Sequence, residues 1–100
     1  MMLRHPRNTG RRLRRAKGVK LREVGDELFL VAPGSDGIHQ LDQMASAAWR
    51  ALSMPRSADE IIGLFQRAFP ETPRRQIARD IKKLLAYLED RRLVVKATKE

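Results

Sequence analysis

The residues of this chain that could do chemistry are few, and their spacing argues against catalysis. His39 lies close in sequence to Ser35, Asp36 and Asp42, which are the residue types of a hydrolytic triad. A triad needs a nucleophile within hydrogen-bond reach of an oriented base, whereas successive side chains of an extended segment point to opposite faces. Asp80 falls at the edge of an apolar helical stripe, where a carboxylate more often caps, pairs with an arginine or faces solvent. We therefore predict that the protein is not an enzyme.

The sequence also contains few residues that could bind a metal or a cofactor. The 100 residues include no cysteine and only two histidines, His5 and His39. Thiolate chemistry, disulfides and Cys-type zinc sites are therefore excluded, and no ligand spacing such as His-Glu-x-x-His occurs. The sequence also lacks a glycine-rich phosphate loop. We expect no metal and no cofactor.

The formal net charge of +9 is concentrated at the start of the chain. Residues 1–20 carry eight basic side chains and no acidic one, whereas the other 80 residues carry 13 basic and 12 acidic side chains. Residues 1–17 are also poor in apolar side chains, so we expect a basic disordered tail there and a nearly neutral domain over residues 18–96. Such a tail can bind phosphate backbones or an anionic membrane, or it can be a solvated extension.

The chain lacks the sequence features of a membrane or secreted protein. No apolar run approaches the roughly 20 residues that a membrane span requires, and residues 1–6 lack the apolar centre of a secretory signal. The absence of cysteine is compatible with a reducing compartment. We expect a soluble, cytoplasmic protein with no membrane span.

Three short extended segments follow the basic region. Val19–Glu23 alternates apolar and charged residues. Leu28–Ala32 is a continuous apolar run, which is typical of a central strand covered on both sides or by both neighbours. Ile38–Leu41 is the third segment. Turn-forming residues separate the segments, first at Gly25-Asp26 and then over Pro33–Gly37. The pattern predicts a three-stranded antiparallel sheet.

Two helices with recognisable starts come next. Asp42 is a suitable N-cap for the first helix, whose apolar stripe includes Trp49. Ser57 and Glu60 have the spacing of a capping box at the start of the second helix. Both starts are therefore defined by residue type as well as by periodicity.

The third and longest helix is expected to begin with Thr72 as its N-cap and Pro73 as its first residue. Leu93–Val95 would close the fold as a short extended tail. The order of elements predicts an α+β fold in which a three-stranded antiparallel sheet is followed by three helices. Such a module offers a free sheet edge beside a helix, which is an arrangement suited to binding a peptide.

The order and spacing of these motifs resemble the PqqD-like family, the pyrroloquinoline quinone synthesis D proteins and their relatives, the RiPP recognition elements. The resemblance covers about residues 17–95. It rests on Gly18-Val19, Leu28 to Pro33, Leu41-Asp42-Gln43 with Ala45, Trp49 and Leu52, Ser57 to Ile62, and Asp80-Ile81 with Leu84-Leu85 and Leu88.

Three positions depart from the family's pattern. Asp42 replaces the usual Asn after Leu41, and Ser53-Met54-Pro55 stands where Asp-Gly is frequent. Arg92 stands before Leu93, where the family commonly has glycine, so a left-handed helix end there would be strained. These departures weaken assignment to the quinone cofactor pathway itself more than to the wider family.

The resemblance implies a winged helix-turn-helix-like fold that acts as a leader-peptide binding chaperone. The precursor peptide would add as an antiparallel strand to the third strand, lie against the third helix, and be presented to a modifying enzyme such as a radical SAM maturase. Main-chain hydrogen bonds would supply affinity, and alternate side chains entering apolar pockets would supply selection. In this chain the peptide-binding edge would be Ile38, His39, Gln40 and Leu41.

Four residues of the third helix are candidates for lining the same groove. They lie beside or opposite the apolar stripe and are Arg75, Ala78, Arg79 and Lys82. Ala78 would leave room for a side chain of the peptide, and the basic residues would favour an acidic leader. These basic residues can equally form a solvated helix face.

Three alternatives stay open at this point. A winged helix can bind DNA through its third helix, with the basic tail along the backbone, although residues 21–100 are nearly neutral and a DNA-binding domain is usually basic. A free sheet edge can also pair with a second copy of the chain and form a homodimer. A structural adaptor without a peptide ligand is the third. The sequence does not identify the precursor, the modifying enzyme or the pathway.

Overall fold

The computed structural model describes residues 11–35 and 37–97, which form two three-stranded antiparallel sheets and three helices. The first sheet has the order β2-β3-β4, with bounds Lys20–Val24, Glu27–Val31 and Ile38–Leu41. The second has the order β5-β1-β6, with bounds Arg56–Ser57, Arg12–Arg15 and Val94–Lys96. The helices are α1 (Gln43–Ala51), α2 (Ala58–Ala68) and α3 (Arg74–Asp90).

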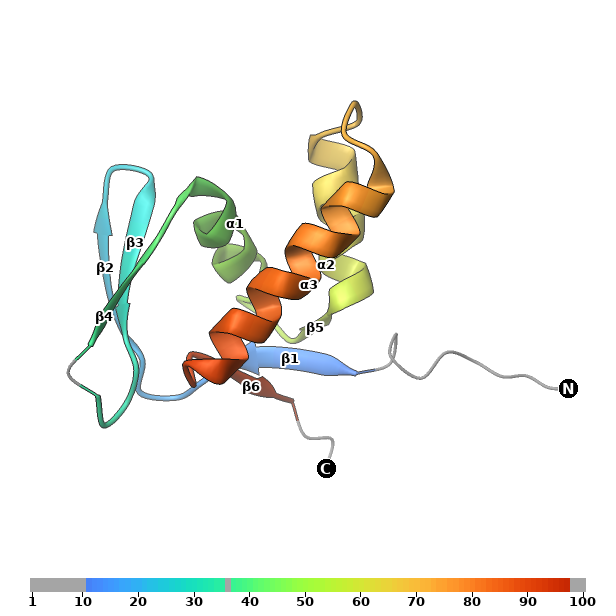
Figure 1. Cartoon of the computed structure of the whole chain (residues 1–100). Coiled ribbons are helices and arrows are strands. Elements are labelled where there is room, and N and C mark those ends of the chain that lie inside the picture. The colour runs from blue at the N-terminus through green and yellow to red at the C-terminus, as the bar shows by residue number, and fades with distance from the viewer. Residues whose placement is uncertain (1–10, 36, 98–100) are drawn as a thin grey trace, which may run out of the picture.

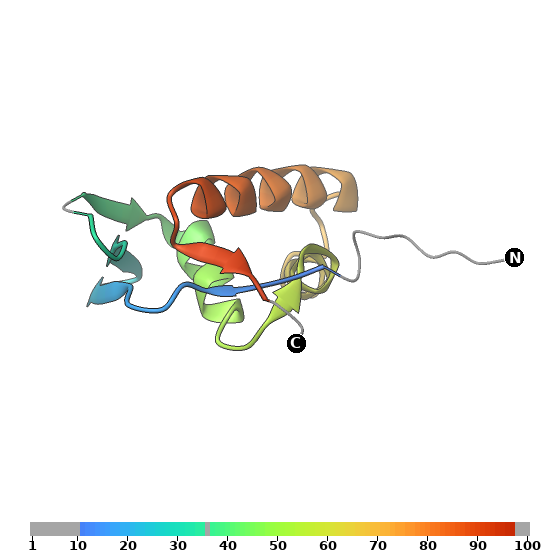
Figure 2. The same ribbon diagram turned by 90° about the horizontal axis from the view of Figure 1, so that it is seen from below.

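The predicted α+β fold, with a three-stranded antiparallel sheet and three helices, is confirmed. Figure 1 shows the β2-β3-β4 sheet at one end of the molecule, with α1 between this sheet and the pair formed by α2 and α3. Strands β1 and β6 of the second sheet lie next to the C-terminal end of α3, on the same side of this helix as α1, as the view from below shows (Figure 2). This second sheet was not foreseen.

The β2-β3 hairpin is closed by a two-residue turn. Gly25 adopts a φ of 63°, which a glycine accepts without strain. Leu28 and Leu30 of β3 are buried, whereas Phe29 and Val31 point to the other face and are only half-buried. The central strand is therefore flanked by both neighbours, but the described residues cover only one of its faces.

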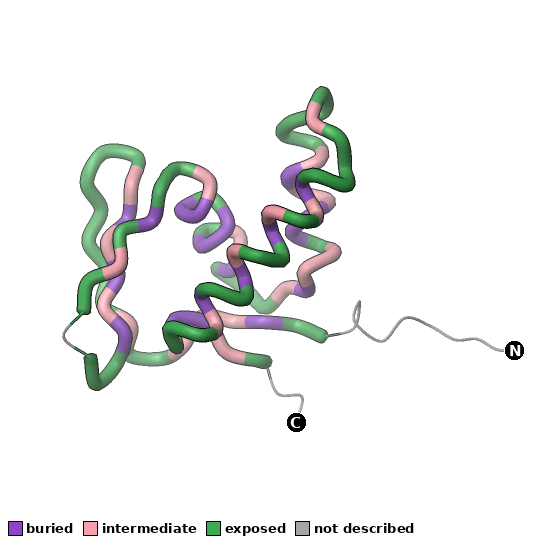
Figure 3. The backbone as a smooth tube through the Cα atoms, in the orientation of Figure 1, coloured by how far each residue is buried: buried purple, intermediate pink, exposed green. Residues whose placement is uncertain are grey.

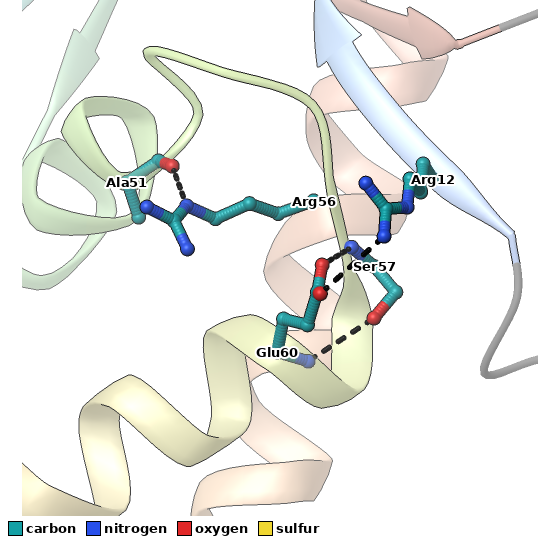
Figure 4. A network of polar contacts seen from close by, with 5 residues as sticks. All are labelled: Arg12, Ala51, Arg56, Ser57 and Glu60. Atoms are coloured by element: carbon teal, nitrogen blue, oxygen red, sulfur yellow. Dashed lines mark hydrogen bonds and ion pairs between the residues drawn. The ribbon is translucent and has the colours of Figure 1, made fainter.

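The first two helices begin where the sequence predicts. The side chain of Asp42 accepts a hydrogen bond from the backbone N–H of Ala45 at 2.9 Å. At α2, the Ser57 hydroxyl accepts from the N–H of Glu60, and the Glu60 carboxylate accepts from the N–H of Ser57, so the capping box is complete (Figure 4).

The start of α3 differs from the prediction. Pro73, with φ −59° and ψ 137°, is the N-cap residue rather than the first helical residue, and no side chain caps this helix end. The predicted cap by Thr72 is therefore wrong. The Pro73 carbonyl instead accepts from the N–H groups of Gln76 and Ile77, because the extended ψ of proline aims that carbonyl into the first turn.

The prediction of a disordered tail over residues 1–17 is wrong for its described part. Residues 1–10 lie outside the described residues, but Arg12–Arg15 form β1, the central strand of the second sheet. Leu13 is 5% exposed and belongs to the core. The folded unit therefore begins before the predicted boundary at residue 18.

Arg15 explains how a strand so rich in arginine can pack against α1. It shares the inward face with Leu13, and its guanidinium lies 4.8 Å from the centre of the Trp49 ring. Its Nε and Nη2 atoms donate to the Trp49 carbonyl at 3.1 and 2.7 Å, and so satisfy a carbonyl near the end of α1. Partial burial lowers the pKa of this guanidinium from its ordinary value.

Two more arginines join the second sheet to the helices. The Arg12 guanidinium lies 3.7 Å from the Glu60 carboxylate, and Arg56 Nε donates to the carbonyl of Ala51 (Figure 4). β1 thereby contacts the start of α2, and β5 contacts the end of α1. The basic residues that looked like a tail are partly used inside the fold.

One continuous core connects both sheets and all three helices, and Figure 3 shows buried positions recurring along β3 and the three helices, whereas β2 is exposed throughout. Its residues that are at most 1% exposed are Leu30, Ala48, Ile61, Ile62, Ile81, Leu88, Leu93 and Val94.

The end of α3 is a glycine-type turn without a glycine. Arg92 has a φ of 63°. The N–H of Leu93 donates to the carbonyl of Leu88, and the N–H of Arg92 donates to the carbonyl of Glu89, which is the Schellman pattern. Leu88 and Leu93 are both fully buried. This turn sends the chain into β6, so the predicted extended tail is a strand paired with β1.

Candidate functional site

The strand β4 leaves one edge unpaired among the described residues, because it pairs only with β3. The two-residue hairpin makes Val24 and Glu27 a hydrogen-bonded pair, and alternation along β3 then directs the N–H and C=O groups of Leu28 and Leu30 toward β4. On β4, the backbone groups of Ile38 and Gln40 consequently point away from the sheet. These two residues present the free edge.

A hollow lies between this edge and α3, with a volume of about 360 Å³, and we call it the β4 hollow. Leu41 and Ala45 in its wall are buried, and Met44 and Leu84 are half-buried, so the inner wall is apolar. Polar and charged side chains complete the lining. The full set is Gln40, Leu41, Asp42, Met44, Ala45, Asp80, Lys83, Leu84 and Tyr87.

His39 and Tyr87 connect β4 directly to α3 beside the hollow. His39 Nδ1 lies 3.3 Å from the Tyr87 hydroxyl oxygen, and the two rings meet edge to face with centroids 6.3 Å apart. The Arg91 guanidinium covers the Tyr87 ring at 4.6 Å from its centroid. Tyr87 is thus positioned from two sides, although it is 39% exposed.

The structure does not bring the four predicted helix residues to the β4 hollow. Arg75 and Arg79 are exposed on α3, Ala78 packs against the core, and Lys82 lines a different hollow with Leu13 of β1. Of the predicted edge residues, Gln40 and Leu41 line the β4 hollow. Ile38 and His39 belong to the same strand, at the end remote from α1.

The α3 residues that do line the hollow are Asp80, Lys83, Leu84 and Tyr87. Asp80, Leu84 and Tyr87 recur at helical spacing, so they share one face next to the buried stripe. The sequence pattern separates this flank of the stripe from the opposite flank that carries Ala78 and Lys82, but it contains no signal for which flank faces β4.

A second hollow adjoins the first and has a volume of about 220 Å³. We call it the Phe69 hollow, and it lies where α1 meets the turn between α2 and α3. Met44 and Asp80 line both hollows. Its full lining is Met44, Phe65, Phe69, Thr72, Gln76, Ile77 and Asp80.

The side chains of the considered triad do not assemble in the described residues. The Ser35 hydroxyl accepts from the N–H of Gly37, and His39 contacts Tyr87 instead. Asp36 lies outside the described residues. Within residues 11–35 and 37–97, no group of three or more metal-ligating side chains is found. In the same residues, no helix is long and apolar enough to cross a membrane.

Comparisons with known proteins agree with this architecture. The family model of coenzyme PQQ synthesis protein D (PqqD) matches residues 27–94. A solved structure described as TbiB1 in complex with the TbiA(beta) leader peptide superimposes with a TM-score of 0.73 at 21% sequence identity, and the match covers 81% of this chain and 93% of that chain. A comparison with curated proteins found no match. Since the family model spans more than half of the chain and includes both β4 and α3, this protein belongs to the coenzyme PQQ synthesis protein D family.

Proposed function

We propose that this protein is a RiPP recognition element, which captures the leader segment of a ribosomal precursor peptide and presents it to a modifying enzyme such as a radical SAM maturase. The observation that carries the proposal is the β4 edge, which no other described strand pairs with and which the backbone of Ile38 and Gln40 forms directly beside the β4 hollow. A similar fold in complex with a leader peptide supports it.

The geometry gives each part of the site a distinct role in this proposal. A peptide that adds to β4 forms main-chain hydrogen bonds with Ile38 and Gln40, which require no particular sequence. Every second peptide side chain then lies on the same sheet face as His39 and Leu41 and points toward α3. These side chains meet the apolar wall at Met44 and Leu84, and this wall selects among peptides.

The charges at the rim make a further contribution to specificity. Lys83 is exposed and lines the β4 hollow, with Asp80 one helical turn before it and Asp42 at the start of α1. Such charges act mainly on the association rate and on discrimination between partners. Lys83 is therefore the α3 residue that we propose to attract an acidic leader, in place of the basic residues farther round the helix.

Amide hydrogen exchange on the full chain tests the proposal. Peptides selected from a random 20-residue display library provide the ligand, since the precursor is unidentified. Binding is expected to slow exchange at the N–H groups of Ile38 and Gln40 but not at Leu21 and Glu23, the corresponding outward amides of the opposite edge strand β2. Protection of the β2 amides alone, or of neither edge, contradicts strand addition at β4.

Sedimentation of the peptide-free protein addresses the homodimer. A dimer joined through β4 must dissociate as the selected peptide binds, because both need the same edge. If the protein instead binds DNA, it is expected to retard a DNA duplex in a gel, with an affinity that falls steeply as the salt concentration rises.

A further inference from the structure

The Phe69 hollow contains an exposed aromatic side chain that the fold does not cover. Phe69 is the C-cap residue of α2 and is 53% exposed, although its ring lies 6.1 Å from that of the buried Phe65. Ile77 contributes a buried apolar wall, and Thr72 and Gln76 add polar side chains to the lining. At about 220 Å³, this hollow is smaller than the roughly 300–1,000 Å³ of small-molecule sites, so it suits a single side chain better than a cofactor.

The two hollows form one path along α3. Met44 and Asp80 belong to both, and the α3 residues of the path run from Gln76 to Tyr87. At 1.5 Å per residue, this stretch of helix is roughly 16 Å long, which is the length of about five extended residues. About five extended residues of a peptide held at β4 therefore suffice to span the path to the Phe69 hollow.

Strand polarity determines which part of the peptide arrives there. Both pairings in the β2-β3-β4 sheet are antiparallel, and a peptide that continues this pattern has its N-terminal end next to Leu41. Leu41 is the end of β4 that leads into α1 and Met44. Residues upstream of the paired segment consequently extend over Met44, whereas residues downstream leave past Ile38.

We infer that the Phe69 hollow is a second recognition site, which binds an apolar side chain of the precursor peptide a few residues upstream of the segment paired with β4. An aromatic or long aliphatic side chain there buries the exposed face of Phe69 and contacts Met44, whose flexible thioether adapts to the shape of the guest. This inference rests on the proposed function, and it identifies the peptide feature beyond the paired strand that sets specificity.

The test uses the tightest peptide from the 20-residue display library, after hydrogen exchange has located its paired segment. Removing the residues upstream of this segment is expected to weaken binding about tenfold, the effect of burying one apolar side chain. Removing the downstream residues is expected to leave affinity unchanged. If upstream removal has no effect, or if downstream removal causes the loss, the inference is overturned.

Protein variants locate the effect. Phe69→Ser is expected to weaken binding of the full peptide about tenfold. The same substitution should not change binding of the upstream-shortened peptide, because that peptide already lacks the side chain that contacts Phe69. Met54→Ser is the matched control, since Met54 is also 53% exposed but lines neither hollow. Equal effects of the two substitutions contradict the inference.

A filled hollow provides a second test that does not depend on removing Phe69. Gln76→Trp places a large ring in the hollow from an exposed position of α3, whereas Arg79→Trp places the same ring at an exposed position of α3 outside both hollows. Only Gln76→Trp is expected to weaken binding of the full peptide. If affinity survives Gln76→Trp while the Ile38 and Gln40 amides remain protected, the second site is disproved and strand addition stands. If the peptide does not protect the Ile38 and Gln40 amides of the unsubstituted protein, the proposed function itself is disproved.

Discussion

The hydroxyl of Ser46 lies between two strands, accepting a hydrogen bond from the N–H of Leu28 at 3.2 Å and donating one to the carbonyl of Leu41 at 3.0 Å. It thereby bridges the backbone of the last residue pair of β3 and β4. Ser46 is fully buried in α1. The helix, the central strand and the candidate peptide-binding edge are therefore joined by one side chain.

Ser46→Ala is expected to lower the free energy of unfolding by about 2–3 kcal/mol, because two buried backbone groups lose their partner. Urea denaturation measures the change. Ser53→Ala, at an exposed serine just after α1, is the control and should change stability by less than about 0.5 kcal/mol. A loss as small as that of the control would mean that the two backbone groups find another partner.

Gln40→Pro is expected to weaken binding of a display-selected peptide about tenfold, since it removes one outward N–H from the β4 edge. Leu21→Pro removes an outward N–H from the opposite edge of the same sheet and should leave affinity unchanged. Isothermal titration calorimetry measures both variants. Gln40→Ala separates the backbone effect from loss of the side chain, which bonds Glu27. Equal affinities of the two proline variants would place the peptide elsewhere.

Lys83→Glu and Lys82→Glu form a pair with identical changes in net charge. Both lysines are exposed on α3, but only Lys83 lines the β4 hollow. For an acidic peptide, Lys83→Glu is expected to reduce affinity about fivefold, or ~1 kcal/mol, mainly through the association rate. Stopped-flow kinetics at two salt concentrations measure this. An equal effect of Lys82→Glu would indicate general charge attraction rather than a rim contact.

Leu13→Ala is expected to lower the free energy of unfolding by about 2–5 kcal/mol, the usual cost of truncating a buried leucine. This result would establish that β1 is an integral part of the fold. Leu21→Ala, at a leucine that is 53% exposed, is the comparison and should cost much less. Thermal denaturation followed by circular dichroism is sufficient. Indistinguishable stabilities would mean that β1 does not contribute to the core.

Arg92→Gly is expected to stabilise the protein by roughly 0.5–1 kcal/mol relative to Arg92→Ala, because glycine adopts the positive φ at this helix end without strain. The comparison with alanine removes the contribution of the arginine side chain. Equilibrium unfolding in guanidinium measures the difference. A lower stability of the glycine variant would show that the strain is absent.

Residue types and spacing determined two of the three helix starts and the β2-β3-β4 sheet, but not β1 or the start of α3. Asp42 and Ser57 mark two helix starts because their oxygens satisfy backbone N–H groups a few residues away. The hairpin at Gly25-Asp26 and the three segments around it follow from local turn chemistry and period-two alternation. The order of these elements, and with it the family, is therefore readable from the sequence.

Only the tertiary structure decided which surfaces meet. Arg15 is partly buried because Trp49, 34 residues away, offers its ring and its carbonyl, and no pattern within Arg12–Arg15 reveals that partner. Periodicity likewise identified the apolar stripe of α3 but not the flank that faces β4, so Lys82 was expected where Lys83 and Tyr87 line the hollow. Local propensity depends on neighbours along the chain. A binding groove depends on contacts between segments far apart in the sequence, and the residue pattern of a single sequence does not predict those contacts.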